Sequence, residues 1–240
     1  MSKFTTEAQI ISGSALLVDE ANPSHELGEV AVTTDGRRFR YAQAGGTALV
    51  VGNLLQAPAE TVADQGLAVA AAGIGATQIT TTSTVTVTAN QYGGGYVLVT
   101  ITPGLGQIFR IKSHPAATAA VVVLTLEDPI QTALTTSSRI DLVNNPYDGV
   151  IQMPATRSGA VVGVAVNDIT ASQYGWIQVG GIANVLSNGG LTVGSQIVAA
   201  DNAGAVEVAA NGTTEAFAAV GRAASGVASG ENGAVYFNLS

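Results

Sequence analysis

The sequence predicts an all-β protein, made of glycine- and threonine-rich β-barrel or sandwich domains that follow an extended N-terminal arm. Short runs of alternating or β-branched residues recur along most of the 240 residues, and such runs suit a pleated, half-buried surface. Gly, Pro, Asn and Asp separate the runs at roughly the 8–12 residue spacing of sandwiches and barrels. No long window has the helical period of about 3.6 residues.

The first expected element is a hairpin within residues 28–41. Asp35-Gly36 lies there between two alternating runs, and Asp-Gly between β-formers is a strong hairpin signal. Residues 47–57 are apolar and end at Pro58. This segment is compatible with a strand or a short helix.

The middle of the chain changes in composition. Residues 58–76 are rich in Ala and Gly and predict loop or helix-like structure, whereas the Thr/Val run at 77–90 predicts one strand with Val85 and Val87 on one face. Further strands are expected at 96–101, 107–112, 119–126 and 149–153. In the last third, short strands separated by turns are expected at 159–166, 174–186, 191–200, 205–210, 216–224 and 233–240.

These patterns divide the chain into three parts. Residues 1–27 are expected to form an arm rich in acidic residues. Residues 28–58 plus 156–240 are expected to form one discontinuous β domain. Residues 59–155 are expected to form an inserted β domain, bounded by prolines at 58 and 154.

Charge is scarce and mainly acidic. Nine Lys and Arg stand against 17 Asp and Glu, so the net charge is 9 − 17 = −8, and only 11% of residues are charged, against about 25% in an average soluble protein. An acidic chain is a poor ligand for nucleic acid, and no apolar run is long enough for a transmembrane helix. The low charge predicts that part of the surface is covered in an assembly.

Chemical motifs are sparse. The chain has no Cys and two His, His25 and His114, which are expected to be solvated loop residues. It contains no nucleophile elbow, no Walker A loop and no metal-ligand spacing. We therefore expect no enzymatic activity, no cofactor, no catalytic residue and no metal site.

One dense feature is a candidate contact surface. Arg37, Arg38, Phe39, Arg40 and Tyr41 hold three of the nine basic groups, and Arg with aromatic residues is enriched at interfaces. The alternative is a hairpin exit whose arginines are solvated or paired with acids of the arm. Trp176, the single Trp, is expected to anchor the core or a subunit contact. Lys3 and Phe4 of the arm complete the candidate contact residues.

Three segments resemble capsid decoration, or cement, proteins of tailed bacteriophages. They are LGEVAVTTDGRRFRYAQAGGTALVVGNLLQAP (27–58), ANQYGGGYVLVTITPGLGQIFRIKSHPAAT (89–118) and GVAVNDITASQYGWIQVGG (163–181). The resemblance rests on glycine and turn patterns and carries over no active-site residue. It implies an all-β protein, a homotrimer on the outer face of an icosahedral shell, which binds neighbouring major capsid proteins.

The sequence therefore predicts a structural virion protein that binds the outer surface of a phage capsid and stabilises contacts between major capsid proteins. A charge of −8 fits the outside of a shell, since packaged DNA would repel it. The alternative is a head-fibre or receptor-binding module that recognises cell-surface glycan. Its aromatic candidates are Tyr92, Tyr96, Tyr147 and Tyr174. A weaker third hypothesis is a glycan hydrolase that uses Glu127, Asp128 and Asp148.

Overall fold

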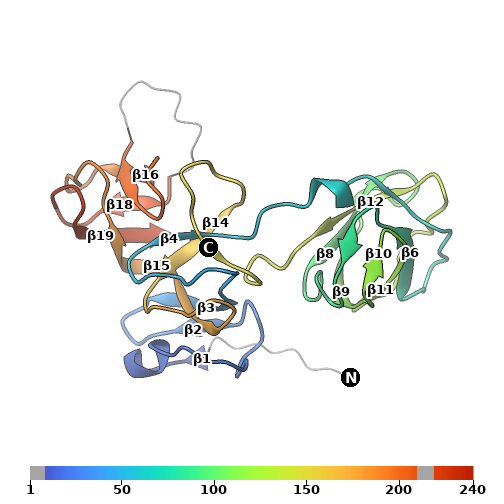
Figure 1. The fold of residues 1–240 in the computed structure, drawn as a ribbon, viewed down its shortest axis with the longest axis horizontal. Helices are drawn as coiled ribbons and strands as arrows, with labels where there is room; N and C mark the ends of the chain where they lie inside the picture. The colour runs from blue at the N-terminus through green and yellow to red at the C-terminus, as the bar shows by residue number, and fades with distance from the viewer. Residues whose placement is uncertain (1–8, 210–218, 240) are drawn as a thin grey trace. The chain divides into compact units, whose positions relative to one another are not determined.

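The computed structural model describes residues 9–209 and 219–239. It consists almost entirely of β-strands, which confirms the predicted all-β class. The chain divides into two compact units, unit 1 with residues 1–58 and 146–240 and unit 2 with residues 59–145 (Figure 1). No helix in the described part is long and apolar enough to cross a membrane.

Unit 1 contains one sheet of eleven strands. Its strands are β1 (Gln9–Ile10), β2 (Val30–Val32), β3 (Arg38–Gln43), β4 (Leu54–Gln56), β13 (Ile151–Gln152), β14 (Val161–Ala165), β15 (Tyr174–Leu186), β16 (Gln196–Ala199), β17 (Val206–Val208), β18 (Gly221–Ala223) and β19 (Asn232–Asn238). A short 3₁₀ helix, η1 (Gly13–Leu16), follows β1. The main path of the sheet runs β1-β2-β3-β15-β19-β18-β16-β17, and β14 joins β15 to β4 and β13.

The long strand β15 connects the two halves of unit 1. Its first half pairs with β3 up to Gly180, and its second half pairs with β19 from Gly180 to Leu186. An irregularity in the register lies between Gln178 and Gly180, and Gly181 has a φ of +87°. A Cβ atom at Gly181 would lie 3.0 Å from the Cα of Arg37. Only glycine therefore fits the position where the strand changes partners.

Unit 2 is a small barrel with its own apolar core. Its strands are β5 (Leu67–Ala68), β6 (Gln78–Thr82), β7 (Thr86–Val87), β8 (Tyr96–Ile101), β9 (Ile108–Ser113), β10 (Ala117–Thr118), β11 (Val121–Leu126) and β12 (Arg139–Val143). Six of them form a sheet in the order β5-β12-β8-β9-β11-β6. A bridge between Val69 and Thr81 joins its two edge strands, so the sheet nearly closes and its hydrogen-bonding edges are largely satisfied.

A buried polar network fixes one end of this barrel. Asp64, in the 3₁₀ helix η2 (Val62–Asp64), is fully buried and accepts hydrogen bonds from Ser83 Oγ (2.7 Å) and Tyr92 Oη (2.5 Å). The backbone N–H of Tyr92 donates to Nε2 of His114 (2.9 Å), which places the ring proton on Nδ1, directed at the carbonyl of Pro115. His114 is thus a satisfied core residue instead of the solvated loop residue expected.

The second boundary of the inserted domain lies earlier in the chain than expected, and the described part of the expected arm belongs to unit 1. The chain returns to unit 1 at Pro146 instead of after Ala155, because the Val150 N–H donates to Gln43 O (2.8 Å) and β13 pairs with β4. Residues 9–27, expected to be part of an extended arm, belong to unit 1. Within them, β1 pairs with β2 in parallel and Leu16 is buried.

Most expected strands form, with one clear exception. The hairpin at 28–41 is present as β2 and β3, which pair antiparallel, and the ambiguous segment 47–57 ends in the strand β4. The Thr/Val run at 77–90, expected to be one strand, forms two strands, β6 and β7. The break occurs where the Ser83 side chain turns inward to the buried carboxylate of Asp64.

The Gly181→Ala substitution tests the change of partners in β15. A methyl group at a φ of +87° strains the backbone, and we expect the free energy of unfolding of unit 1 to fall by about 1–3 kcal/mol. Denaturant unfolding of the full chain measures this change. Gly46→Ala is the matched control, because a Cβ there meets nothing within 4 Å. Equal stability of the two variants would contradict the assignment.

Candidate functional site

The arginines of the predicted contact ribbon all have partners within unit 1. The Nε of Arg37 donates to Asp35 (2.8 Å), Arg38 donates to Oδ1 of Asn238 (2.8 Å) and Arg40 donates to the carbonyl of Gly28 (2.7 Å). The Thr33 hydroxyl and the Arg37 guanidinium beside Asp35 hold the pKa of its carboxyl below its usual range. The arginines are therefore paired, as in the alternative of a hairpin exit. Their partners are Asp35, Asn238 and Gly28, however, and not acids of the arm.

The aromatic candidates lie in the core of unit 1. Phe39, Tyr41 and Trp176 are fully buried, or nearly so, in a cluster with Leu16 and Ala31. They are therefore core residues and form no exposed contact surface. The prediction that Phe39 and Tyr41 belong to a contact surface is wrong, whereas Trp176 takes the first of its two expected roles, that of a core anchor. Lys3 and Phe4 lie outside the described residues.

A carboxylate from the N-terminal segment holds this aromatic cluster in place. Glu20 accepts hydrogen bonds from the Ser24 hydroxyl (2.6 Å) and the Tyr41 hydroxyl (2.6 Å). His25 lies within 4.9 Å of the Trp176 ring centroid, and its Nδ1 is 3.1 Å from Glu29. Burial and the hydrogen bond to Glu20 raise the pKa of Tyr41. Residues 20–29 therefore contact β3 through Tyr41 and β15 through Trp176.

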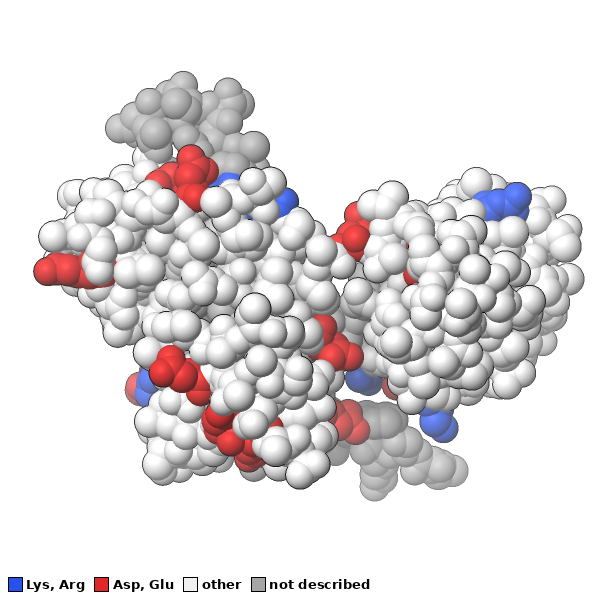
Figure 2. All heavy atoms as spheres, viewed as in Figure 1, with Lys and Arg blue, Asp and Glu red and all other residues white. Residues whose placement is uncertain are grey.

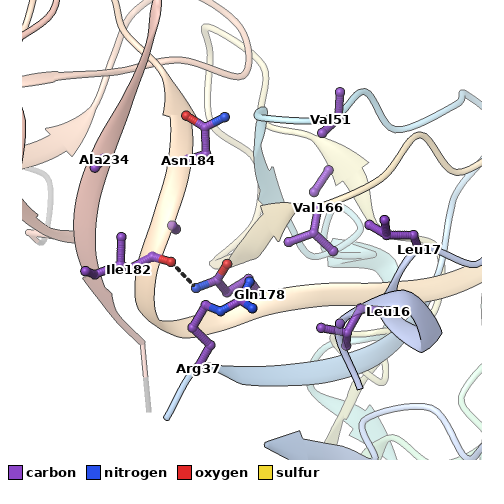
Figure 3. A pocket seen from close by; sticks show the side chains of 12 residues that line it. Leu16, Leu17, Arg37, Val51, Val166, Gln178, Ile182, Asn184 and Ala234 are labelled. Atoms are coloured by element: carbon purple, nitrogen blue, oxygen red, sulfur yellow. Dashed lines mark hydrogen bonds between the residues drawn. The ribbon is translucent and has the colours of Figure 1, made fainter. Parts of the chain in front are cut away.

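Unit 1 has an open pocket of about 370 Å³ beside the bend of β15 (Figure 3). Its polar lining includes Arg37, Asn184 and the buried Gln178. Figure 3 shows Gln178 inside the curve of β15, with η1 on one side and the Val51 segment on another. The larger apolar side chains that line it are Leu16, Leu17, Val51, Val166 and Ile182.

Three of these apolar side chains remain accessible to solvent. Leu17 is 58% exposed, Val51 47% and Ile182 50%. Arg37 is the one charged side chain among the described residues that line the pocket. In the view of Figure 2, charged side chains are sparse, and the acidic ones are scattered instead of forming one patch. An accessible, nearly uncharged apolar surface of this kind is typical of a protein-binding site.

Unit 2 carries a second exposed apolar patch on the outside of its barrel. Tyr96 of β8 is paired with Val143 of β12, and the neighbouring Leu98 is paired with Ile108 of β9. Tyr96, Val143 and Ile108 are all exposed. Because side chains of paired residues on one face lie about 5 Å apart, the four residues form a diagonal apolar band across three strands, flanked by Arg110 opposite Tyr96 and by Asp141 opposite Leu98.

The residues of the two alternative functions are divided between the two units. Tyr92 is buried and Tyr96 is exposed in unit 2, whereas Tyr147 and Tyr174 are partly buried in unit 1. The acids of the hydrolase hypothesis are similarly divided. Glu127 pairs with Arg110 in unit 2 (3.5 Å), while Asp148 belongs to unit 1, where burial raises its pKa. Within the described residues, no group of three or more acidic or His side chains is arranged to hold a metal.

Of the residues that line the pocket, sequence reasoning singled out Arg37 and missed the others. Leu16 and Leu17 belong to the segment 1–27, expected to be an arm, Val51 to the segment 47–57, compatible with a strand or a helix, and Ile182 to the expected strand at 174–186. Local patterns do not show that these three segments meet. The one available signal was the Gly180-Gly181 doublet within a strand, since glycines there mark bulges and close backbone approach.

Comparison of this chain with protein-family models, with curated proteins and with solved structures gives no significant match.

The Glu20 contacts predict a pH-dependent stability of unit 1. The hydrogen bonds from Ser24 and Tyr41 lower the pKa of Glu20 below 4.5. Their contribution is therefore complete above pH 4.5 and is lost as the pH falls through the lower pKa of the folded state. We expect the denaturant midpoint to fall on acidification, and to fall less in Glu20→Gln.

Unfolding curves at a series of pH values measure this difference. Asp201→Asn is the control, because the Asp201 side chain is exposed and has no hydrogen bond to any described residue. A Glu20→Gln variant with the same acid dependence as the unchanged chain would remove Glu20 from this role.

Proposed function

We propose that this chain is a structural virion protein that binds the outer surface of a phage capsid and stabilises contacts between major capsid proteins. It is proposed to act as a homotrimer, without nucleic acid, membrane, cofactor or catalysis. The observation that carries the proposal is the open apolar pocket of unit 1, whose exposed side chains Leu17, Val51 and Ile182 lie on a surface of low charge. The three segments that resemble decoration proteins support the same conclusion.

The mechanism is stabilisation by binding. Apolar surface removed from water contributes about 25 cal/mol per Å², and an interface of standard size covers about 800 Å² on each partner. A protein that spans neighbouring capsid subunits adds this free energy to the intact shell only. Expansion or rupture must then break the added contacts, so the shell withstands more internal pressure.

The glycan-binding alternative has less support. It requires exposed aromatic side chains at loop ends, and of the four tyrosines expected to serve it, only Tyr96 is exposed. Tyr96 lies at the start of β8, next to Val143 and Arg110. A patch of this composition is more typical of protein contact.

Shell binding is the direct test of the proposed function. Purified chain is mixed with expanded, empty shells of the phage that encodes it, and bound chain is measured by sedimentation. We expect saturable binding and a higher rupture temperature of the decorated shells. Removing residues 1–8 tests the contribution of Lys3 and Phe4, since a cut after residue 25 would also remove Leu16 and Glu20 from unit 1. Absence of the chain from purified virions would refute the proposal.

The apolar band of unit 2 is the proposed subunit contact. We expect the full chain to be a trimer by mass photometry, and the double variant Tyr96→Asp with Ile108→Asp to be a monomer of 24.0 kDa, because charges at the centre of an apolar interface oppose its burial. Ile74→Asp is the control, since Ile74 is exposed in unit 2 outside the band. A monomeric unchanged chain at micromolar concentration would contradict the trimer.

A further inference from the structure

The edge of β15 opposite β19 is interrupted inside the pocket. On that edge, the pairing with β3 stops at Gly180, which is opposite Arg38, the first residue of β3. The next backbone contact is the Leu186 N–H, which donates to Gly52 O (2.8 Å). Between these two points no strand among the described residues pairs with this edge. The open interval spans roughly 15–20 Å, the length of a short strand.

The hydrogen-bonding register shows which backbone groups face the open interval. The Leu239 N–H donates to Val179 O (3.1 Å), so the odd-numbered residues of this stretch face β19. Because backbone groups alternate along a strand, those of Ile182 and Asn184 face the open edge. Among the described residues, none hydrogen-bonds to the N–H of Ile182 or to the N–H and C=O of Asn184.

The Gln178 side chain satisfies two carbonyls at the start of the open edge. Its buried amide donates from Nε2 to the carbonyl of Gly180 (3.0 Å) and to the carbonyl of Ile182 (2.8 Å), the second bond being the one drawn in Figure 3. The N–H of Ile182 and both backbone groups of Asn184 therefore remain open. Edge strands are normally shortened, covered or charged, yet Ile182 and Asn184 are exposed and uncharged.

The surroundings of the open edge are apolar with a basic rim. Leu17 and Val51 line the pocket and are exposed, so they remain available to side chains of an added strand. Arg37 also lines the pocket. Its Nε donates to Asp35, its guanidinium lies 5.6 Å from the centroid of the Phe39 ring, and its two terminal nitrogens have no hydrogen bond to any described residue. With Arg38 packed against Gly180, the three charged side chains at this end sum to +1, in a chain of net charge −8.

We infer that the open edge of β15 binds an extended segment of a protein partner as an added strand. The segment pairs with Ile182 and Asn184, places alternate apolar side chains against Leu17 and Val51, and directs an acidic side chain to Arg37. Strand addition takes affinity from main-chain hydrogen bonds and specificity from pockets for alternate side chains. The identification of the partner as a capsid protein rests on the proposed function; the mode of binding does not.

A displayed library of random heptapeptides, selected on the full chain, tests the inference. We expect enriched peptides to alternate apolar residues and to contain Asp or Glu. Fluorescence polarisation with the best peptide is expected to show at least about tenfold weaker binding by Ile182→Asp and by Arg37→Gln. Val193→Asp is expected to bind unchanged, because Val193 is an exposed apolar residue outside the pocket.

Amide hydrogen exchange identifies the mode of binding. In the free chain, the N–H groups of Ile182 and Asn184 are expected to exchange fast, and the peptide is expected to slow both. No enriched peptide, equal binding by Ile182→Asp, or unchanged exchange at these two amides would overturn the inference. An oligomer that Ile182→Asp converts to monomers would also overturn it, because the edge would then belong to a second copy.

The two proposals fail separately in these experiments. Sedimentation with shells that is unaffected by Ile182→Asp would leave the proposed function intact and refute strand addition at β15. Peptide binding with slowed exchange, in a chain absent from virions, would support strand addition and refute the capsid partner.

Discussion

Unit 1 depends on a single strand that changes partners. The first half of β15 is bonded to β3 and its second half to β19, so the N-terminal hairpin and the C-terminal strands share one backbone. The change occurs at Gly180 and Gly181, where Arg38 and Arg37 pack so closely that side chains would collide. The apolar cluster that contains Trp176 draws on β15 before this point, and the cluster that contains Phe237 draws on β15 after it, through Ala183 and Val185.

The same constraint creates the candidate site. The pairing of β3 with β15 stops at Arg38 and Gly180, so the edge of β15 beyond Gly180 loses its neighbour. Among the described residues, the next backbone contact on this edge is at Leu186. The buried amide of Gln178 replaces part of the missing strand by bonding to two carbonyls. The pocket is therefore a consequence of the topology, and its apolar walls come from segments distant in sequence.

The sequence predicts local elements well and their association poorly. Asp35-Gly36 locates a hairpin, and the alternation of Phe109 and Ile111 with Arg110 and Lys112 locates a buried face, because both signals lie within a few residues. The burial of Phe39 and Tyr41 depends on Trp176 and the segment around Glu20, which are long-range contacts. The split at Ser83 likewise depends on the buried Asp64. For the pocket, the sequence pointed only to Arg37 and to the glycine doublet.

An exposed strand edge without charged side chains can pair with the edges of other chains. A long, flat, apolar edge promotes aggregation, whereas unit 2 avoids one by nearly closing its barrel through Val69 and Thr81. In unit 1 the open interval is short and recessed between η1 and the Val51 segment. In the proposed strand addition, an extended chain enters between these two segments and places an acidic residue against Arg37. The position of the edge between η1 and the Val51 segment thus limits non-specific pairing. The open backbone groups of Ile182 and Asn184 remain for the proposed partner strand.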